Sequence, residues 1–77
     1  MRIPNENDRR LSEGDKLQVK DYAGIYHVES VAESNVSRVA YIIRIATGQR
    51  LTLSWKPAWG FWSTMGKGSL EYAVKVK

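Results

Sequence analysis

Two stretches of alternating residues, separated by Thr47-Gly48-Gln49, constrain the fold of this chain more than any other feature. Residues 38–46 alternate between two sets, which are Val39, Tyr41, Ile43 and Ile45 on one side and Arg38, Ala40, Ile42, Arg44 and Ala46 on the other. Residues 50–55 place Leu51, Leu53 and Trp55 on one side. A period of two is the period of a β-strand, so the pattern predicts a β-hairpin.

The register of this hairpin depends on the number of residues in its loop. Directly opposed residues of two antiparallel strands lie on the same face of the sheet. A three-residue loop, 47–49, places Ile45 opposite Leu51 and Tyr41 opposite Trp55, which joins the two apolar sets into one core face. The same register predicts that the basic residues lie on the opposite face, namely Arg38, Arg44, Arg50 and Lys56.

Three further segments have the pattern of strands. Residues 16–20 and 69–77 alternate cleanly, with Leu17 and Val19 facing inward in the first of them. Residues 25–32 are ambiguous, because Ile25 and Val31 share one face whereas Tyr26 and Val28 share the other. A β-bulge would allow both sets to reach the core. The sequence therefore predicts five strands.

These strands predict an all-β fold, a single five-stranded antiparallel small barrel or roll of the SH3-like kind. A flat open sheet would leave two long edges unpaired and one apolar face exposed to solvent, and curling of the sheet removes most of that exposure. The predicted domain spans residues 13–77. Residues 1–12 form a polar N-terminal tail, either loosely attached or folded into one helical turn with Asn5 as its cap and Asp8 at the third position.

The start of the predicted domain resembles a known family. Residues 13–24 contain Gly14-Asp15, then an alternating strand, then a loop with Gly24. This order resembles the first strand and loop of SH3-like barrels of the KOW and Tudor type. The resemblance implies a small five-stranded barrel, and it carries over no ligand-binding residue, because the aromatic stretch at residues 55–62 lies outside it.

The stretch Trp55–Trp62 holds all three tryptophans and the one phenylalanine of the chain. Trp55 follows the inward alternation of Leu51 and Leu53, so we expect it in the core. Pro57 ends the strand, because proline cannot donate to a ladder. Trp59, Phe61 and Trp62 then fall in a glycine-containing loop. A core this small cannot absorb all of them, so at least one of Trp59 and Trp62 is expected to be exposed.

The charges are unevenly distributed along the chain. The formal net charge is +4. Residues 1–33 carry five basic and seven acidic side chains, whereas residues 34–77 carry seven basic side chains and one acidic. No acid lies between Glu33 and Glu71. A basic half favours an acidic partner such as nucleic acid, and the alternative is an ordinary solvated surface.

Composition argues against catalysis. The chain has no cysteine and one histidine, His27, which cannot assemble a catalytic triad or a metal site without further converging ligands. We therefore expect no enzyme activity, no metal and no cofactor. The N-terminal residues lack the apolar core of a signal peptide, and no apolar run approaches the ~18 residues of a membrane span. A cytoplasmic location without a membrane partner is expected.

Two functions remain, and both use the aromatic stretch. The first is nucleic-acid binding, to DNA or RNA, in which basic residues capture phosphates and Trp59 or Trp62 stacks on bases. Its predicted site residues are Arg38, Arg44, Arg50, Lys56, Trp59, Trp62 and Lys67. The alternative is a protein–protein interaction module, an adaptor, an inhibitor or a homodimer, that docks through residues 55–62. The absence of acids in residues 34–70 favours the first function.

Overall fold

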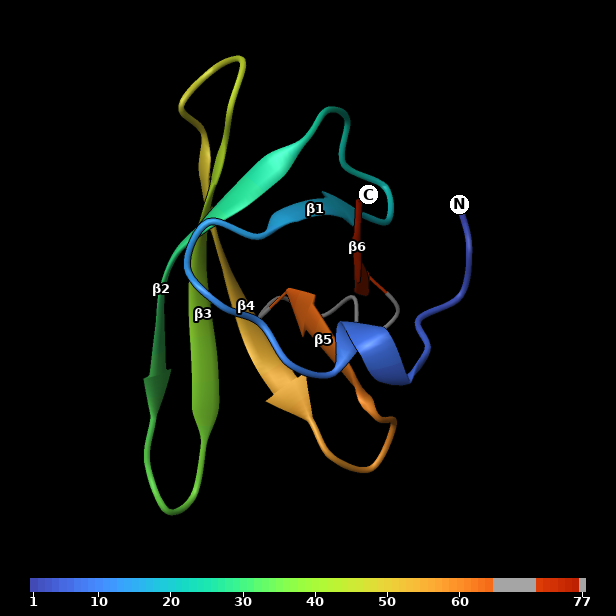
Figure 1. The fold of residues 1–77 in the computed structure, drawn as a ribbon, viewed down its shortest axis with the longest axis vertical. Coiled ribbons are helices and arrows are strands. Elements are labelled where there is room, and N and C mark those ends of the chain that lie inside the picture. The colour runs from blue at the N-terminus through green and yellow to red at the C-terminus, as the bar shows by residue number, and fades with distance from the viewer. Residues whose placement is uncertain (65–70, 77) are drawn as a thin grey trace.

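The computed structural model describes residues 1–64 and 71–76. Its elements are η1 (Glu6–Asp8), β1 (Lys16–Val19), β2 (Tyr26–Glu33), β3 (Arg38–Arg44), β4 (Arg50–Lys56), β5 (Phe61–Thr64) and β6 (Ala73–Lys75). The six strands form one antiparallel sheet in the order β5-β4-β3-β2-β1-β6 (Figure 1). The prediction of an all-β antiparallel fold is confirmed.

The prediction of a five-stranded barrel or roll is wrong in its number of strands and in its barrel alternative. A sixth strand, β5, forms from residues that the sequence assigned to a loop. The sheet is also not closed into a barrel, because the described parts of its two sides meet through an isolated bridge between Ser63 and Tyr72 rather than a ladder. The sheet is instead strongly curved (Figure 1). Its inner face buries the core, which includes Leu11, Leu17, Val19, Tyr26, Val28, Ala40, Ile42, Leu53, Trp62 and Ala73.

The hairpin of β3 and β4 exists, but its predicted register is wrong. Ile42 pairs with Leu51 and Ala40 with Leu53, so the inner face of β3 is the set that contains the arginines. Ala40 and Ile42 are buried, whereas Tyr41 is 46% exposed. The cause lies in the turn, where the Arg44 N–H donates to the Gln49 carbonyl at 2.7 Å. Four residues, 45–48, therefore connect the strands instead of three, and this change moves the other alternating set inward.

The predicted β-bulge in residues 25–32 is confirmed. Val28 pairs with Ile42, and after an irregularity at Glu29 the pairing resumes with Ser30 opposite Tyr41. Tyr26 and Val28 before the bulge are fully buried, and Val31 after it packs against the core. The extra residue thus allows both apolar sets of β2 to face the same side.

Of the two forms expected for the N-terminal segment, the structure shows the single turn. Asn5 caps η1, and the Asp8 carboxylate accepts a hydrogen bond from the Asn5 N–H at 2.8 Å, so the capping box is present. Among the described residues, η1 is the only helix, and no helix there is long and apolar enough to cross a membrane. The turn is held firmly, because the Asp8 side chain is 1% exposed and its carboxylate has three partners.

Asp8 attaches this turn to the edge of β6. Its carboxylate accepts hydrogen bonds from the Arg2 guanidinium at 2.6 and 2.8 Å and from the Lys75 N–H at 2.7 Å. Arg2 also donates to the Lys75 carbonyl at 3.0 Å. Asp8 and Arg2 thereby satisfy the backbone N–H and the carbonyl of Lys75, which lies in an edge strand with no neighbouring strand on that side. A covered edge is protected from pairing with another chain.

These contacts predict how stability responds to acid. Burial raises the pKa of Asp8, but the hydrogen bonds from Arg2, Lys75 and Asn5 outweigh it and hold the pKa below its ordinary value. The stabilisation is therefore complete above about pH 4, the unfolded pKa, and is lost as pH falls through the lower folded pKa. Urea titrations between about pH 5 and pH 2 should show a steeper loss of stability for the native chain than for Asp8→Asn. If the free energy of unfolding fell equally with pH in the native chain and in Asp8→Asn, the Asp8 carboxylate would not be the source of the pH dependence.

Candidate nucleic-acid interface

The aromatic stretch is a tight hairpin rather than a loop. We call residues 55–62 the aromatic hairpin. Pro57 ends β4, as predicted, and the turn closes through hydrogen bonds from the Trp59 and Gly60 N–H groups to the Lys56 carbonyl at 3.0 and 2.8 Å. Gly60 has a φ of 75°, a value that favours glycine. The chain then pairs Trp62 with Trp55 and begins β5.

The hairpin places its tryptophans in three different environments. Trp62 is 0% exposed, and its indole N–H donates to the Arg9 carbonyl at 3.0 Å. Trp55 packs against the core and is half-buried, with its ring centroid 5.7 Å from that of Trp62. Trp59 is 55% exposed. The expectation that at least one of Trp59 and Trp62 is exposed is confirmed, and only Trp59 of these two offers a ring face to a ligand.

Arg38 joins the aromatic hairpin from the neighbouring strand. Its guanidinium carbon lies 5.2 Å from the ring centroid of Trp55 and 5.2 Å from that of Trp62. Its Nε is 3.3 Å from Glu33 Oε1. Arg38 is able to reach both rings because the observed register turns it toward the inner side of the sheet. These cation–π contacts hold the guanidinium in one place at the end of β3.

The other predicted basic residues do not form a single face. Arg44 shares the inner side with Arg38 but lies at the opposite end of β3, about 20 Å away at the usual rise per residue. Arg50 and Lys56 lie on the outer side, and Arg50 is 3.7 Å from Glu29. The predicted basic face is therefore wrong, because the register divides its members between the two sides of the sheet. Lys67 lies outside the described residues.

The structure adds a basic residue that the sequence analysis did not select. A Cβ placed on Gly60 would lie 3.7 Å from Arg9 Nη2, so the guanidinium of Arg9 lies against the turn of the aromatic hairpin. The Arg9 carbonyl is the one that receives the Trp62 hydrogen bond. The signal in the sequence was the Arg9-Arg10 pair in an otherwise acidic half of the chain. Nothing local to that pair indicates that it meets residues 60 and 62.

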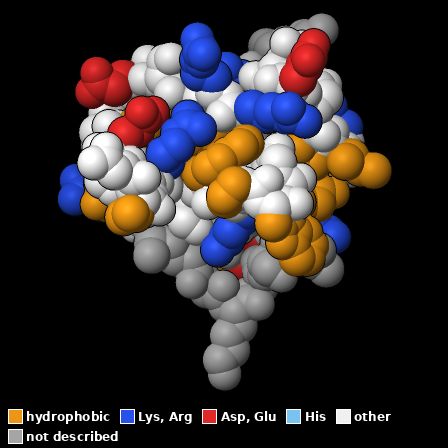
Figure 2. Space-filling view, turned by 90° about the horizontal axis from the view of Figure 1, so that it is seen from below, with side chains coloured by type: hydrophobic (Ala, Val, Ile, Leu, Met, Phe, Trp, Pro, Cys, Tyr) orange, Lys and Arg blue, Asp and Glu red, His pale blue; other side chains and the backbone are white. Residues whose placement is uncertain are grey.

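One end of the sheet gathers these aromatic and basic residues, with Arg38 on its inner side and Lys56 on its outer side. We call this end the basic aromatic end, and it is made up of Arg9, Arg38, Lys56, Trp59 and Phe61. It lies at the end of the molecule that contains the β2–β3 and β4–β5 connections (Figure 1). Figure 2 views the molecule from this end and shows hydrophobic side chains interleaved with lysine and arginine side chains. Trp59 packs edge-on against Phe61, with centroids 5.7 Å apart. An exposed aromatic cluster therefore lies beside basic side chains, of which Arg38 is held by its contacts with two indole rings.

Aromatic contacts continue from this surface across the sheet. The Phe61 ring lies 5.5 Å from that of Tyr72, and Lys20 Nζ lies 5.4 Å from the Tyr72 ring centroid. Phe61 and Tyr72 are both partly exposed. The cluster therefore extends from the aromatic hairpin toward β1, with a further lysine at its far limit.

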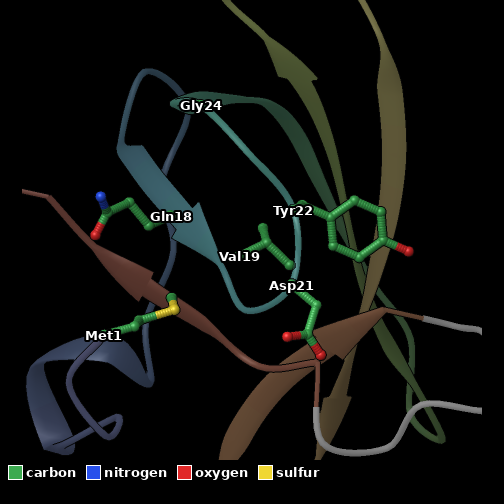
Figure 3. Close-up of a pocket in the computed structure, with 6 residues that line it drawn as sticks. All are labelled: Met1, Gln18, Val19, Asp21, Tyr22 and Gly24. Atoms are coloured by element: carbon green, nitrogen blue, oxygen red, sulfur yellow. The ribbon is translucent and has the colours of Figure 1, made fainter.

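A hollow beside β1 is a second candidate site (Figure 3). It has a volume of about 320 Å³ and is lined by Met1, Gln18, Val19, Asp21, Tyr22 and Gly24. Burial, followed by the charge of Glu71, raises the pKa of Tyr22. The Tyr22 ring points away from Met1 and Gln18 (Figure 3). Among the described residues, no group of three or more His, Cys, Asp or Glu side chains could hold a metal ion.

Comparisons of the chain with models of protein families, with curated proteins and with solved structures found no match. The chemistry of the basic aromatic end is that of non-covalent capture, since guanidinium and ammonium groups attract anions and exposed aromatic rings stack on planar groups.

Proposed function

We propose that this protein is a non-catalytic nucleic-acid-binding domain that uses its basic aromatic end. The observation that supports this most directly is the 55% exposed Trp59 ring on a hairpin flanked by Arg9, Arg38 and Lys56. No acidic residue occurs in the sequence between Glu33 and Glu71, so the hairpin itself adds no negative charge. Exposed aromatic rings beside basic side chains are the usual means of holding a nucleic-acid strand.

The proposed mechanism combines two kinds of contact. Arg9, Arg38 and Lys56 attract phosphate groups, and Arg38 does so from a position already ordered by its contacts with two indole rings. Trp59 stacks on a base. Of the residues expected from the sequence, this proposal keeps Arg38, Lys56 and Trp59 and adds Arg9. Arg44 and Arg50 have no part in it, and neither has the buried Trp62.

A salt titration and a tryptophan variant test the proposal together. Three phosphate contacts on a single strand should give a slope of about −2 in a plot of log affinity against log salt concentration. Trp59→Ala should weaken binding about tenfold, within the ~1–3 kcal/mol that base stacking contributes. Fluorescence anisotropy of a labelled oligonucleotide of about 12 nucleotides, at about 50 mM salt, measures both effects.

The matched control is Tyr41→Ala, which removes an aromatic ring that is 46% exposed on the outer side of β3. It should leave the affinity unchanged. The proposal is abandoned if the native protein binds neither DNA nor RNA at low salt, or if Trp59→Ala binds as tightly as the native chain and Tyr41→Ala.

Protein–protein docking through the aromatic hairpin is the second candidate. It is favoured by the exposed Trp59 ring and the exposed Pro57 beside it, because tryptophan and arginine are the residues most enriched in binding hot spots. In its homodimer version, the native chain sediments as a dimer and Trp59→Ala as a monomer. A monomeric native chain would eliminate that version.

We also propose a more specific architecture for the fold. Residues 13–24 resemble the start of SH3-like barrels of the KOW and Tudor type, and we propose that this protein is an open, six-stranded relative of that architecture. We also propose a cytoplasmic location.

A further inference from the structure

A small groove lies between the β2–β3 connection and the aromatic hairpin. Its volume is about 210 Å³, and it is lined by Ser34, Asn35, Val36, Ser37, Arg38, Trp55 and Pro57. Sites for whole drug-sized ligands usually have volumes of about 300–1,000 Å³. This groove is smaller, so it suits a single planar group that belongs to a larger molecule.

One wall of the groove is a short loop whose shape is fixed by its own hydrogen bonds. Ser34 Oγ accepts from the Ser37 N–H at 3.1 Å and from the Val36 N–H at 3.4 Å, and the Ser34 N–H donates to the Ser37 carbonyl at 2.8 Å. Asn35 is at the exposed tip of this loop. Its side-chain amide makes no hydrogen bond within residues 1–64 and 71–76, so both its donor and its acceptor are open to a ligand.

The other wall is aromatic and positively charged. The guanidinium carbon of Arg38 lies 5.2 Å from the ring centroid of Trp55, and Pro57 continues the wall beyond the end of β4. Unpaired bases stack on aromatic rings and on arginine planes, and their edges form hydrogen bonds with amide side chains. A carboxylate of a peptide would pair only with the guanidinium of Arg38, because it has no flat face to lie on Trp55 and no donor–acceptor edge for the Asn35 amide. The lining therefore fits a base better than an acidic side chain.

We propose that this groove is a base-binding subsite, so that the protein prefers single-stranded nucleic acid to a duplex. The inference rests on the proposed function and goes beyond it by naming the class of substrate. Bases within a duplex are covered on both faces and paired along their edges, and they cannot enter the groove without being unstacked. A single strand presents one base to Trp59 and another to the groove.

The test compares two strand types and two variants. Anisotropy is measured with a labelled oligothymidine of about 12 nucleotides and with a hairpin duplex of similar charge. We expect the native chain to bind the single strand at least about tenfold more tightly, which is the size of a single base-stacking contribution. Asn35→Phe, which fills the groove from an exposed loop, should remove most of this preference and leave duplex binding unchanged.

Gln49→Phe provides the matched control. Gln49 is an exposed residue that directly follows the turn at 45–48, at the other end of β3 from the groove (Figure 1). This variant should bind like the native chain, and thermal unfolding should show that both variants fold. Equal binding of single strand and duplex by the native chain, or an unchanged preference in Asn35→Phe, overturns the subsite but leaves the proposed function standing. Failure of the native chain to bind either strand overturns both.

Discussion

Trp62→Ala should lower the free energy of unfolding by about 3–5 kcal/mol, the usual cost of removing a large buried aromatic ring. Trp62 is 0% exposed, packs on Trp55 and donates its indole hydrogen to the Arg9 carbonyl. A chain of this length is stable by only about 4–11 kcal/mol. The loss should therefore appear as a large fall in the urea midpoint, or as failure to fold at all.

Trp59→Ala is the control for this experiment, because it removes the same side chain from an exposed position of the same hairpin. Its urea midpoint should remain within about 0.5 kcal/mol of the native value, as is usual for surface substitutions. Trp62→Phe should lie between the two, since it keeps most of the packing and loses the hydrogen bond to Arg9. Equal destabilisation by Trp59→Ala and Trp62→Ala would mean that the hairpin is packed differently from the structure.

Asp8→Ala should cost about 3 kcal/mol. The substitution leaves the Lys75 and Asn5 N–H groups without their charged acceptor and releases Arg2 from β6. Each hydrogen bond to a charged group contributes about 1.5–3 kcal/mol, and part of this is recovered when water reaches the exposed N-terminal segment. Denaturation in urea at pH 7 measures the loss.

Arg2→Ala distinguishes the two halves of this attachment. The Arg2 side chain is 44% exposed, so its removal should cost much less than removal of the buried carboxylate. Asp8→Ala should also weaken the proposed nucleic-acid binding, because η1 leads directly into Arg9 at the basic aromatic end. An Asp8→Ala protein as stable as the native chain would show that the turn is not anchored at β6.

Much of the local structure could be read from the sequence. The strand segments, the bulge in β2, the cap at Asn5 and the end of β4 at Pro57 all follow from alternation, spacing and side-chain chemistry over a few residues. The exposure of one tryptophan followed from the limited size of the core. Strand β5 was missed because four residues after a glycine turn do not show alternation clearly when two of them are aromatic.

The candidate site could be predicted only in part. The aromatic stretch, Arg38 and Lys56 were found from composition and from the absence of acids. Arg9 was missed because its proximity to Gly60 depends on how the N-terminal segment crosses the molecule. Arg44 and Arg50 were grouped with Arg38 on the assumption of a three-residue turn. The observed register excludes both from the site, because Arg50 lies on the other side of the sheet and Arg44 lies at the far end of β3.

The sequence by itself determined that this chain forms antiparallel strands joined by short turns, with an aromatic stretch after the strand that ends at Pro57. It did not determine which face of β3 is buried, because Val39, Tyr41 and Ile43 compete with Ala40 and Ile42, and both sets are apolar enough to form a core. The tertiary structure decided this through the four-residue turn at 45–48 and the packing of Ile42 against β2 and β4. That choice buries small and branched residues at the centre of the sheet and leaves the two arginines at its ends, where Arg38 can cover the indole rings of Trp55 and Trp62.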